Sequence, residues 1–86
     1  MEIYVITYTY IDNEAINLFD SKTRCFSTLE KAQKRLKAFK KEEIAKCKSE
    51  NSEYVIMNDE DNIFSIEING RLYHDAFIRK RTLDKE

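Results

Sequence analysis

The chain has 86 residues, 42% of them apolar and 36% charged, with one glycine, no proline and no tryptophan. This length provides for one domain, 1–86, with one hydrophobic core, and the apolar content is too high for a disordered chain. Fifteen Lys and Arg nearly cancel sixteen Asp and Glu, so the overall charge indicates neither a polyanion nor a membrane as partner. No apolar run approaches the ~20 residues that cross a bilayer, and no signal peptide is visible. We expect a folded, cytoplasmic protein.

The chain starts with its clearest strand pattern. Nearly every residue over 3–11 is β-branched or aromatic, which is typical of a strand. Both faces of this strand are largely apolar, as in a central strand or one covered on both sides. Turn-forming side chains follow at 12–14. A second, less regular strand is expected at about 16–19, at 24–26, or over both with a break at 20–22.

A long helix is predicted from about 28 to 46. Ser27 and Glu30 have the spacing of a capping box, in which the two side chains satisfy backbone N–H groups reciprocally, and Phe26 precedes the cap as a hydrophobic staple residue. At 100° per residue, five side chains fall within an arc of roughly 80° and form the expected core stripe: Leu29, Ala32, Leu36, Phe39 and Cys47. Glu43 falls inside the same arc, so we expect the last turn to fray, bend or leave the core.

The last third of the chain returns to strand patterns. A short apolar strand is expected at 54–57, an acidic turn at 58–62 and another strand at 63–68. Asn-Gly at 69–70 indicates a two-residue hairpin turn, since both central positions need a positive φ. The return strand runs from 71 to about 80. The predicted fold is α+β, with one long helix packed on a face of an antiparallel sheet of four to five strands, in the order β-β-α-β-β-β.

The predicted hairpin contains a conflict of register. A two-residue loop places Ile68 opposite Arg71 and Ile66 opposite Tyr73, and directly opposed side chains share a face. The aliphatic face of one strand would then meet a mixed face of the next. Either a bulge shifts the register, or both faces of the hairpin are partly covered.

The sequence has little equipment for catalysis. General acid–base and nucleophilic steps need paired groups within hydrogen-bond reach, and the single histidine, His74, lies next to Asp75 on the opposite strand face. Cys25 and Cys47 are expected to be reduced thiols, and one histidine with two cysteines cannot complete a four-ligand zinc site. The only glycine lies in the hairpin turn, which excludes a phosphate-binding loop. We expect no enzymatic activity, no cofactor and no metal site.

Basic residues concentrate in the predicted helix. Between Leu29 and Lys48 there are eight basic and three acidic residues, a local balance of +5. Five lysines spread over the helix face opposite the core stripe: Lys31, Lys34, Lys37, Lys41 and Lys48. Such a face neutralises phosphates with a steep dependence on salt, although solvated helices commonly carry one too. Nucleic-acid binding through these lysines is the alternative function.

Aromatic side chains indicate a protein partner instead. Tyrosine is favoured at interfaces because its rigid apolar ring ends in a hydrogen-bonding group. If one helix covers one face of the sheet, the other face stays partly open and exposes an apolar patch for a partner. The candidate residues are Tyr4, Tyr8 and Tyr10 of the first strand, or Tyr73 and Phe77 of the last. An uncovered face or an unpaired edge strand also makes a homodimer reasonable.

Three features together resemble a known group of proteins: the tyrosine-rich first strand, the Phe-Ser-Thr-x-Glu-Lys-Ala helix start at 26–32 and the late acidic strand pair. They are similar to small uncharacterised proteins of phages and other bacterial mobile elements, and to small bacterial domains of unknown function. The resemblance covers roughly residues 3–39. It implies a non-enzymatic inhibitor or regulator that occupies a surface of a host protein in the host cytoplasm, such as a defence nuclease targeted by an anti-CRISPR protein.

Overall fold

The computed structural model describes residues 2–12 and 19–82. The elements in chain order are β1 (Glu2–Asp12), β2 (Phe19–Phe26), α1 (Leu29–Ser49), β3 (Tyr54–Glu60), β4 (Ile63–Ile68) and β5 (Leu72–Thr82). All neighbouring strands are antiparallel, and the sheet has the order β2-β1-β5-β4-β3. The α+β fold in the order β-β-α-β-β-β is therefore confirmed, with five strands.

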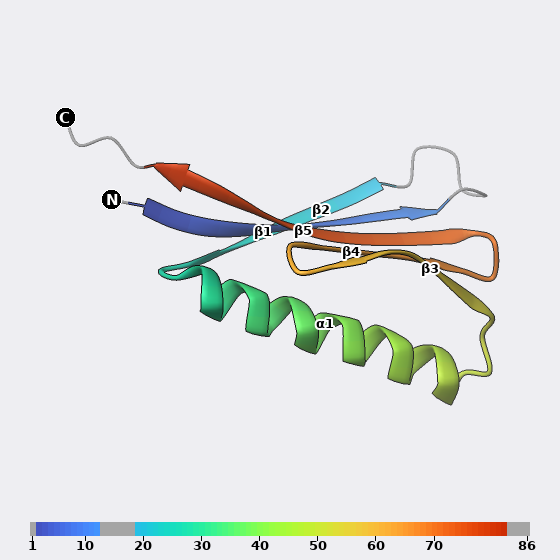
Figure 1. The fold of residues 1–86 in the computed structure, drawn as a ribbon. Helices are drawn as coiled ribbons and strands as arrows, with labels where there is room; N and C mark the ends of the chain where they lie inside the picture. The colour runs from blue at the N-terminus through green and yellow to red at the C-terminus, as the bar shows by residue number, and fades with distance from the viewer. Residues whose placement is uncertain (1, 13–18, 83–86) are drawn as a thin grey trace.

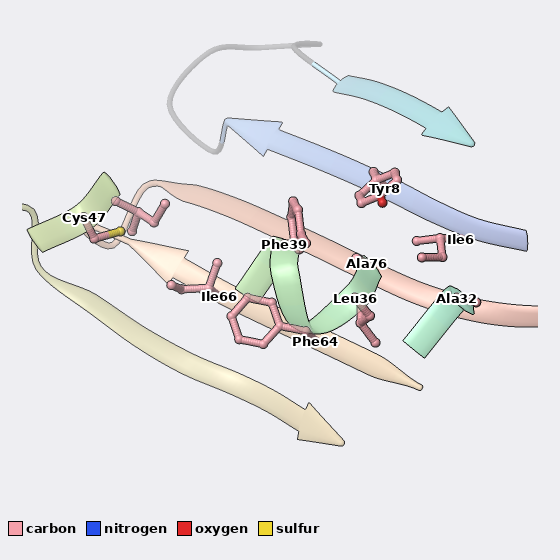
Figure 2. Packing of buried hydrophobic residues seen from close by; sticks show 10 residues of the cluster. Ile6, Tyr8, Ala32, Leu36, Phe39, Cys47, Phe64, Ile66 and Ala76 are labelled. Atoms are coloured by element: carbon pink, nitrogen blue, oxygen red, sulfur yellow. The ribbon is translucent and has the colours of Figure 1, made fainter. Parts of the chain in front are cut away.

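The molecule has two layers, because α1 crosses a single face of the sheet (Figure 1). Alternation along β1 directs Ile6 and Tyr8 toward the helix, and their direct partners on β5 are Ile78 and Ala76. Side chains from α1, β1, β4 and β5 form the core (Figure 2). Its buried apolar members are Ile6, Tyr8, Ala32, Leu36, Phe39, Cys47, Phe64, Ile66, Ile68 and Ala76. The edge strands β2 and β3 therefore flank a core centred on β1, β5 and β4.

The helix begins one residue later than the capping box predicts. Thr28 is the N-cap, with an extended backbone and a side-chain oxygen that accepts a hydrogen bond from the Lys31 backbone N–H at 3.2 Å. Glu30 is then the second residue of the helix, where its negative charge interacts favourably with the positive end of the helix dipole. The predicted reciprocal capping box between Ser27 and Glu30 is therefore wrong. Ser27 instead accepts from the Lys31 ammonium at 3.4 Å.

The last turn of α1 stays on the sheet, against expectation. The helix continues to Ser49, and both Glu43 and Cys47 are buried. Glu43 remains in the core stripe because its Oε1 lies 3.0 Å from Nδ1 of His74 on β5. This polar partner on the sheet offsets the free-energy cost of burying the Glu43 carboxylate.

A shifted register resolves the conflict in the β4–β5 hairpin. Asn69 and Gly70 both have positive φ, 55° and 64°, and the Arg71 N–H donates to the Ile68 carbonyl at 3.0 Å, which closes the expected turn. Ile68 nevertheless pairs with Leu72, so the connection between the paired residues contains Arg71 in addition to the two predicted loop residues. The aliphatic face of β4 consequently meets the apolar face of β5.

Two strand boundaries also differ from the prediction. β2 runs through 20–22 without a break, and the predicted residues 16–18 lie outside the described part of the chain. β3 extends through Asn58 to Glu60, with a register shift between Ile56 and Asn58. The Asn58 amide donates to Ser65 Oγ at 3.2 Å, and this cross-strand bond keeps residues in the ladder that were expected to form the acidic turn.

Candidate binding surfaces

The face of the sheet opposite α1 carries one of the two aromatic groups expected to bind a protein. Tyr73 and Phe77 lie on β5, and the direct partners of Phe77 on this face are Thr7 and Ile63. Both rings are half-buried. The Arg79 guanidinium carbon lies 5.3 Å from the centroid of the Phe77 ring. Aromatic and arginine side chains are enriched at protein interfaces, and this uncovered face presents both.

A polar stripe divides the uncovered face. Ser65 Oγ donates to Asp75 Oδ1 at 2.7 Å and accepts from the Asn58 amide at 3.2 Å. Ser65 is fully buried by these neighbours. Because Asp75 lies between Tyr73 and Phe77 along β5, the two rings belong to separate apolar areas rather than to one continuous patch.

The other candidate surface is β3, which pairs with β4 and forms an edge of the five-stranded sheet. Val55, Ile56 and Met57 are 58%, 38% and 52% exposed, and they are the exposed large apolar side chains among the described residues. Val55 is opposite Glu67, which is opposite Tyr73. The exposed edge therefore continues onto the uncovered face. The strand pattern at 54–57 predicted where this strand lies in the sequence, but it did not predict that the strand would form an edge of the sheet.

The tyrosines of β1 do not form an exposed patch, and that expectation is wrong. Tyr8 is only 8% exposed, and its ring lies 5.1 Å from the Phe39 ring. Tyr4 and Tyr10 pack against the core, and the Tyr10 ring meets the His74 ring edge-on at 4.9 Å. The cause is the strand alternation, which directs all three toward the face that α1 covers.

The lysine-rich face of α1 lies in solvent. Five side chains predicted to form it are exposed: Lys31, Lys34, Lys37, Lys41 and Lys48. Lys40, which lies between this face and the sheet, instead forms an ion pair with Asp59 of β3. The phasing of the helix is thus as predicted, while its binding to nucleic acid stays a prediction.

A groove of about 450 Å³ lies between α1 and the edge strand β2. Core rings form its floor, and long charged side chains of β2 and α1 form its walls. Its residues are Tyr8, Tyr10, Lys22, Thr23, Arg24, Arg35, Phe39, Glu42, Glu43 and Lys46. We call it the α1–β2 groove. Sequence reasoning missed it, since nothing in the helix pattern shows which edge strand the helix leaves uncovered.

One ion pair spans the helix wall of this groove. Arg35 Nη1 and Nη2 donate to the two carboxylate oxygens of Glu42 at 3.1 and 3.3 Å. The bond to Glu42 raises the pKa of Arg35, and the same bond lowers the pKa of Glu42. Tyr8 contributes to the raised pKa of Arg35 as well. Even so, no hydrogen bond of acceptable geometry reaches the Tyr8 hydroxyl or Arg35 Nε, and both atoms are buried.

Sequence reasoning also missed the contact between His74 and Glu43. Their side chains are 15% and 11% exposed, and 31 residues separate them in sequence. A carboxylate beside an imidazole orients the ring for acid–base catalysis when a nucleophile is within reach. Cys47 lies one helical turn from Glu43, but burial raises the pKa of its thiol, which opposes formation of the nucleophilic thiolate. The pair joins α1 to β5.

The chain matches no protein-family model, no curated protein and no solved structure. Among the described residues, no helix is long and apolar enough to cross a membrane. Its function is therefore inferred from its own surfaces.

Proposed function

We propose that this is a non-enzymatic binding protein that recognises another protein through β3 and the adjoining uncovered face. The observation that carries this proposal is the run Val55-Ile56-Met57, exposed on an edge strand. An exposed apolar edge strand is a template for pairing with another chain, and proteins normally protect such edges. The stability of the fold does not require three exposed apolar side chains, whereas a partner protein that covers them accounts for their presence.

The partner would bind by adding an extended segment to the sheet. The outer edge of β3 offers backbone N–H and C=O groups for such a segment, and alternate side chains provide specificity. Glu53 and Glu60 are exposed at the two ends of this edge, so a segment with basic residues flanking an apolar centre is complementary to it. Tyr73 extends the contact onto the uncovered face.

The resemblance to small proteins of mobile elements extends this proposal to a host protein as the target. A segment added to β3 would place this domain across a surface of that protein. A defence nuclease of the CRISPR type would then be inhibited because its substrate is excluded. This part of the proposal depends on the resemblance rather than on any contact in the fold.

The edge is tested with the double variant Val55→Lys and Met57→Lys. Both side chains are more than half exposed, so the folded state should survive, and two charges should prevent apolar strand addition. The matched control is Ala45→Lys, at an exposed position of α1. We expect the tagged parent and the control to retain the same partner, by mass spectrometry, and the double variant to lose it.

Light scattering completes this test. A dimeric parent that the double variant renders monomeric would identify the partner as a second copy of the chain. The proposal is overturned if the double variant remains folded and retains both partner capture and oligomeric state. Replacement of Tyr73 by serine should weaken capture less, since this ring extends the contact but does not form the edge.

Nucleic-acid binding is a second candidate, favoured by the exposure of the five lysines on the helix face opposite the core stripe. It predicts retention on duplex nucleic acid at low salt, with log affinity falling linearly as log salt rises. Charge reversal at Lys34, Lys37 and Lys41 should abolish retention without unfolding, because these positions lie off the core stripe. Absence of binding at ~50 mM salt, where phosphate contacts are strong, would exclude this function.

A further inference from the structure

The α1–β2 groove combines a buried floor with an excess of positive charge. Tyr8 and Phe39 lie at its base, and both are more than nine-tenths buried. Lys22 and Arg24 reach it from β2, because their direct partners on β1, Tyr8 and Ile6, face the helix. This groove lies at the β2 edge of the sheet, the edge opposite β3.

Two buried polar groups at this floor, the Tyr8 hydroxyl and Arg35 Nε, have no hydrogen-bond partner of acceptable geometry. The two side chains lie close enough for Tyr8 to raise the pKa of Arg35, but this contact satisfies neither group fully. Buried polar groups normally pair. Because both residues line the groove, an oxygen bound there is placed to accept from them.

The charges of the groove are unevenly paired. Glu42 neutralises Arg35, and Glu43 is held by His74. Among the residues that the structure describes, no carboxylate forms an ion pair with the other three cations of the groove: Lys22, Arg24 and Lys46. Arg24 instead lies over the Phe26 ring, at 5.4 Å from its centroid.

We propose that the α1–β2 groove binds a phosphate group, with Arg35 and the Tyr8 hydroxyl as donors and Lys22, Arg24 and Lys46 as the surrounding charges. The planar guanidinium matches the geometry of carboxylate and phosphate oxygens. Three further cations exceed what one carboxylate neutralises, whereas a phosphate carries about −1.5 to −2 near neutral pH. Phosphate is therefore the better complement.

Glu42 already occupies part of this site as an internal oxyanion. Its carboxylate binds the Nη1 and Nη2 edge of Arg35 while its side chain stays 61% exposed. Exposed ion pairs of this kind contribute little to stability, so an incoming phosphate can displace Glu42 at small cost. Removal of Glu42 should therefore strengthen phosphate binding modestly, because it releases Arg35.

The test is titration of the ¹⁵N-labelled protein with inorganic phosphate at constant ionic strength, followed by chemical shifts. Succinate in parallel distinguishes a carboxylate from a phosphate. Arg35→Gln removes the anchor and should weaken binding about tenfold or more, as for loss of a charged hydrogen bond. Tyr8→Phe removes one neutral donor and should weaken it about two- to tenfold. Glu42→Gln removes the competitor and should tighten binding about two- to fivefold.

Arg81→Gln is the matched control, since it removes one guanidinium from an exposed position outside the groove. Binding should be unchanged in this variant, and the shifts of the parent should concentrate at the groove residues. The assignment is overturned if Arg81→Gln weakens binding as much as Arg35→Gln, if Glu42→Gln has no effect or weakens binding, or if succinate binds more tightly than phosphate. A failure to saturate by about 100 mM phosphate would equally exclude a specific site.

This inference is independent of the proposed protein interface. The lysine substitutions at Val55 and Met57 leave every groove residue in place, so that variant should bind phosphate like the parent. Loss of protein capture and loss of phosphate binding are thus separate outcomes, each with its own variants.

Discussion

The two faces of the sheet are made by the same strands but differ in what they bury. Toward α1, β1 and β5 present residues such as Ile6, Tyr8 and Ala76, which pack against Leu36 and Phe39 of the helix. On the other face, a polar stripe centred on the buried Ser65 separates two half-buried aromatic rings. The covered face is apolar apart from the contact between His74 and Glu43, whereas a polar stripe interrupts the uncovered face.

The difference follows from the width of one helix. α1 covers the centre of the sheet, where the core side chains of β1, β5 and β4 lie, and leaves both edge strands partly uncovered. At one edge this produces the positively charged groove beside β2, and at the other the exposed apolar side chains of β3. The covered face thus supplies stability, while the candidate binding surfaces lie where the helix does not reach.

The largest test of this contrast compares two phenylalanines. Phe39 packs between Tyr8 and Phe64, with ring centroids 5.1 and 6.1 Å away. Phe39→Ala should destabilise the domain by about 3–5 kcal/mol, through lost burial and a cavity. Phe77→Ala, on the uncovered face, should cost about 1 kcal/mol or less, because solvent fills the space. Urea denaturation measures both. If both variants lost the same stability, and the loss depended on protein concentration, a second copy of the chain would be shown to cover the face opposite α1.

The next test concerns how the covered face tolerates charge. Glu43→Leu and His74→Phe each leave the other partner unpaired and mostly buried, and each should cost about 1–3 kcal/mol. The double variant should lose less than the sum, because a buried pair replaced by apolar groups is often neutral. Additive losses in a double-mutant cycle would mean that the 3.0 Å contact does not hold α1 on the sheet.

A smaller effect is expected where the helix begins. Thr28→Ala removes the side chain that accepts from the Lys31 N–H, and should cost about 1 kcal/mol. Ser27→Ala should cost only a few tenths of a kcal/mol, since Ser27 caps no backbone group in this arrangement. Thermal unfolding of the two variants decides between them. A larger loss for Ser27→Ala would restore the predicted capping box.

The sequence predicted the positions of the helix and strands well, but it predicted poorly which residues and elements lie next to one another in space. Period and turn chemistry located β1, α1 and the Asn69-Gly70 turn, because these signals depend on residues close in the chain. The single-residue error at Thr28 arose because Ser27 and Thr28 are adjacent and both can cap a helix. The sequence left the register of the β4–β5 hairpin open, and the pairing of the two strands selected the shifted register.

The candidate sites depended on information that local pattern does not contain. Tyr8 and Tyr73 have the same residue type on strands, yet one lies in the core and the other on the uncovered face. Which face the helix covers is a long-range outcome, as are the pairing of Glu43 with His74 and the choice of β3 as an edge. Charge periodicity alone did place the helix lysines correctly, since the helix has only one buried stripe.

The smallest expected effect is at the margin of the covered face, where Arg35 meets Glu42. The hydrogen bond from Arg35 lowers the pKa of the Glu42 carboxyl. A carboxyl whose pKa is lower in the folded state stabilises that state above its unfolded pKa, ~4.3, and this contribution is lost as the pH falls through the folded value. The titration of the Glu42 side chain, followed by ¹³C chemical shift, should therefore have a midpoint below the ordinary range. In Arg35→Gln the midpoint should rise to that range, and added salt should move the parent in the same direction. The thermal stabilities of the parent and Glu42→Gln should converge in acid, with only a small gap at neutral pH. An unchanged Glu42 midpoint in Arg35→Gln would show that the guanidinium is not held by Glu42 in solution, and Glu42 would then not be the internal competitor that a phosphate must displace.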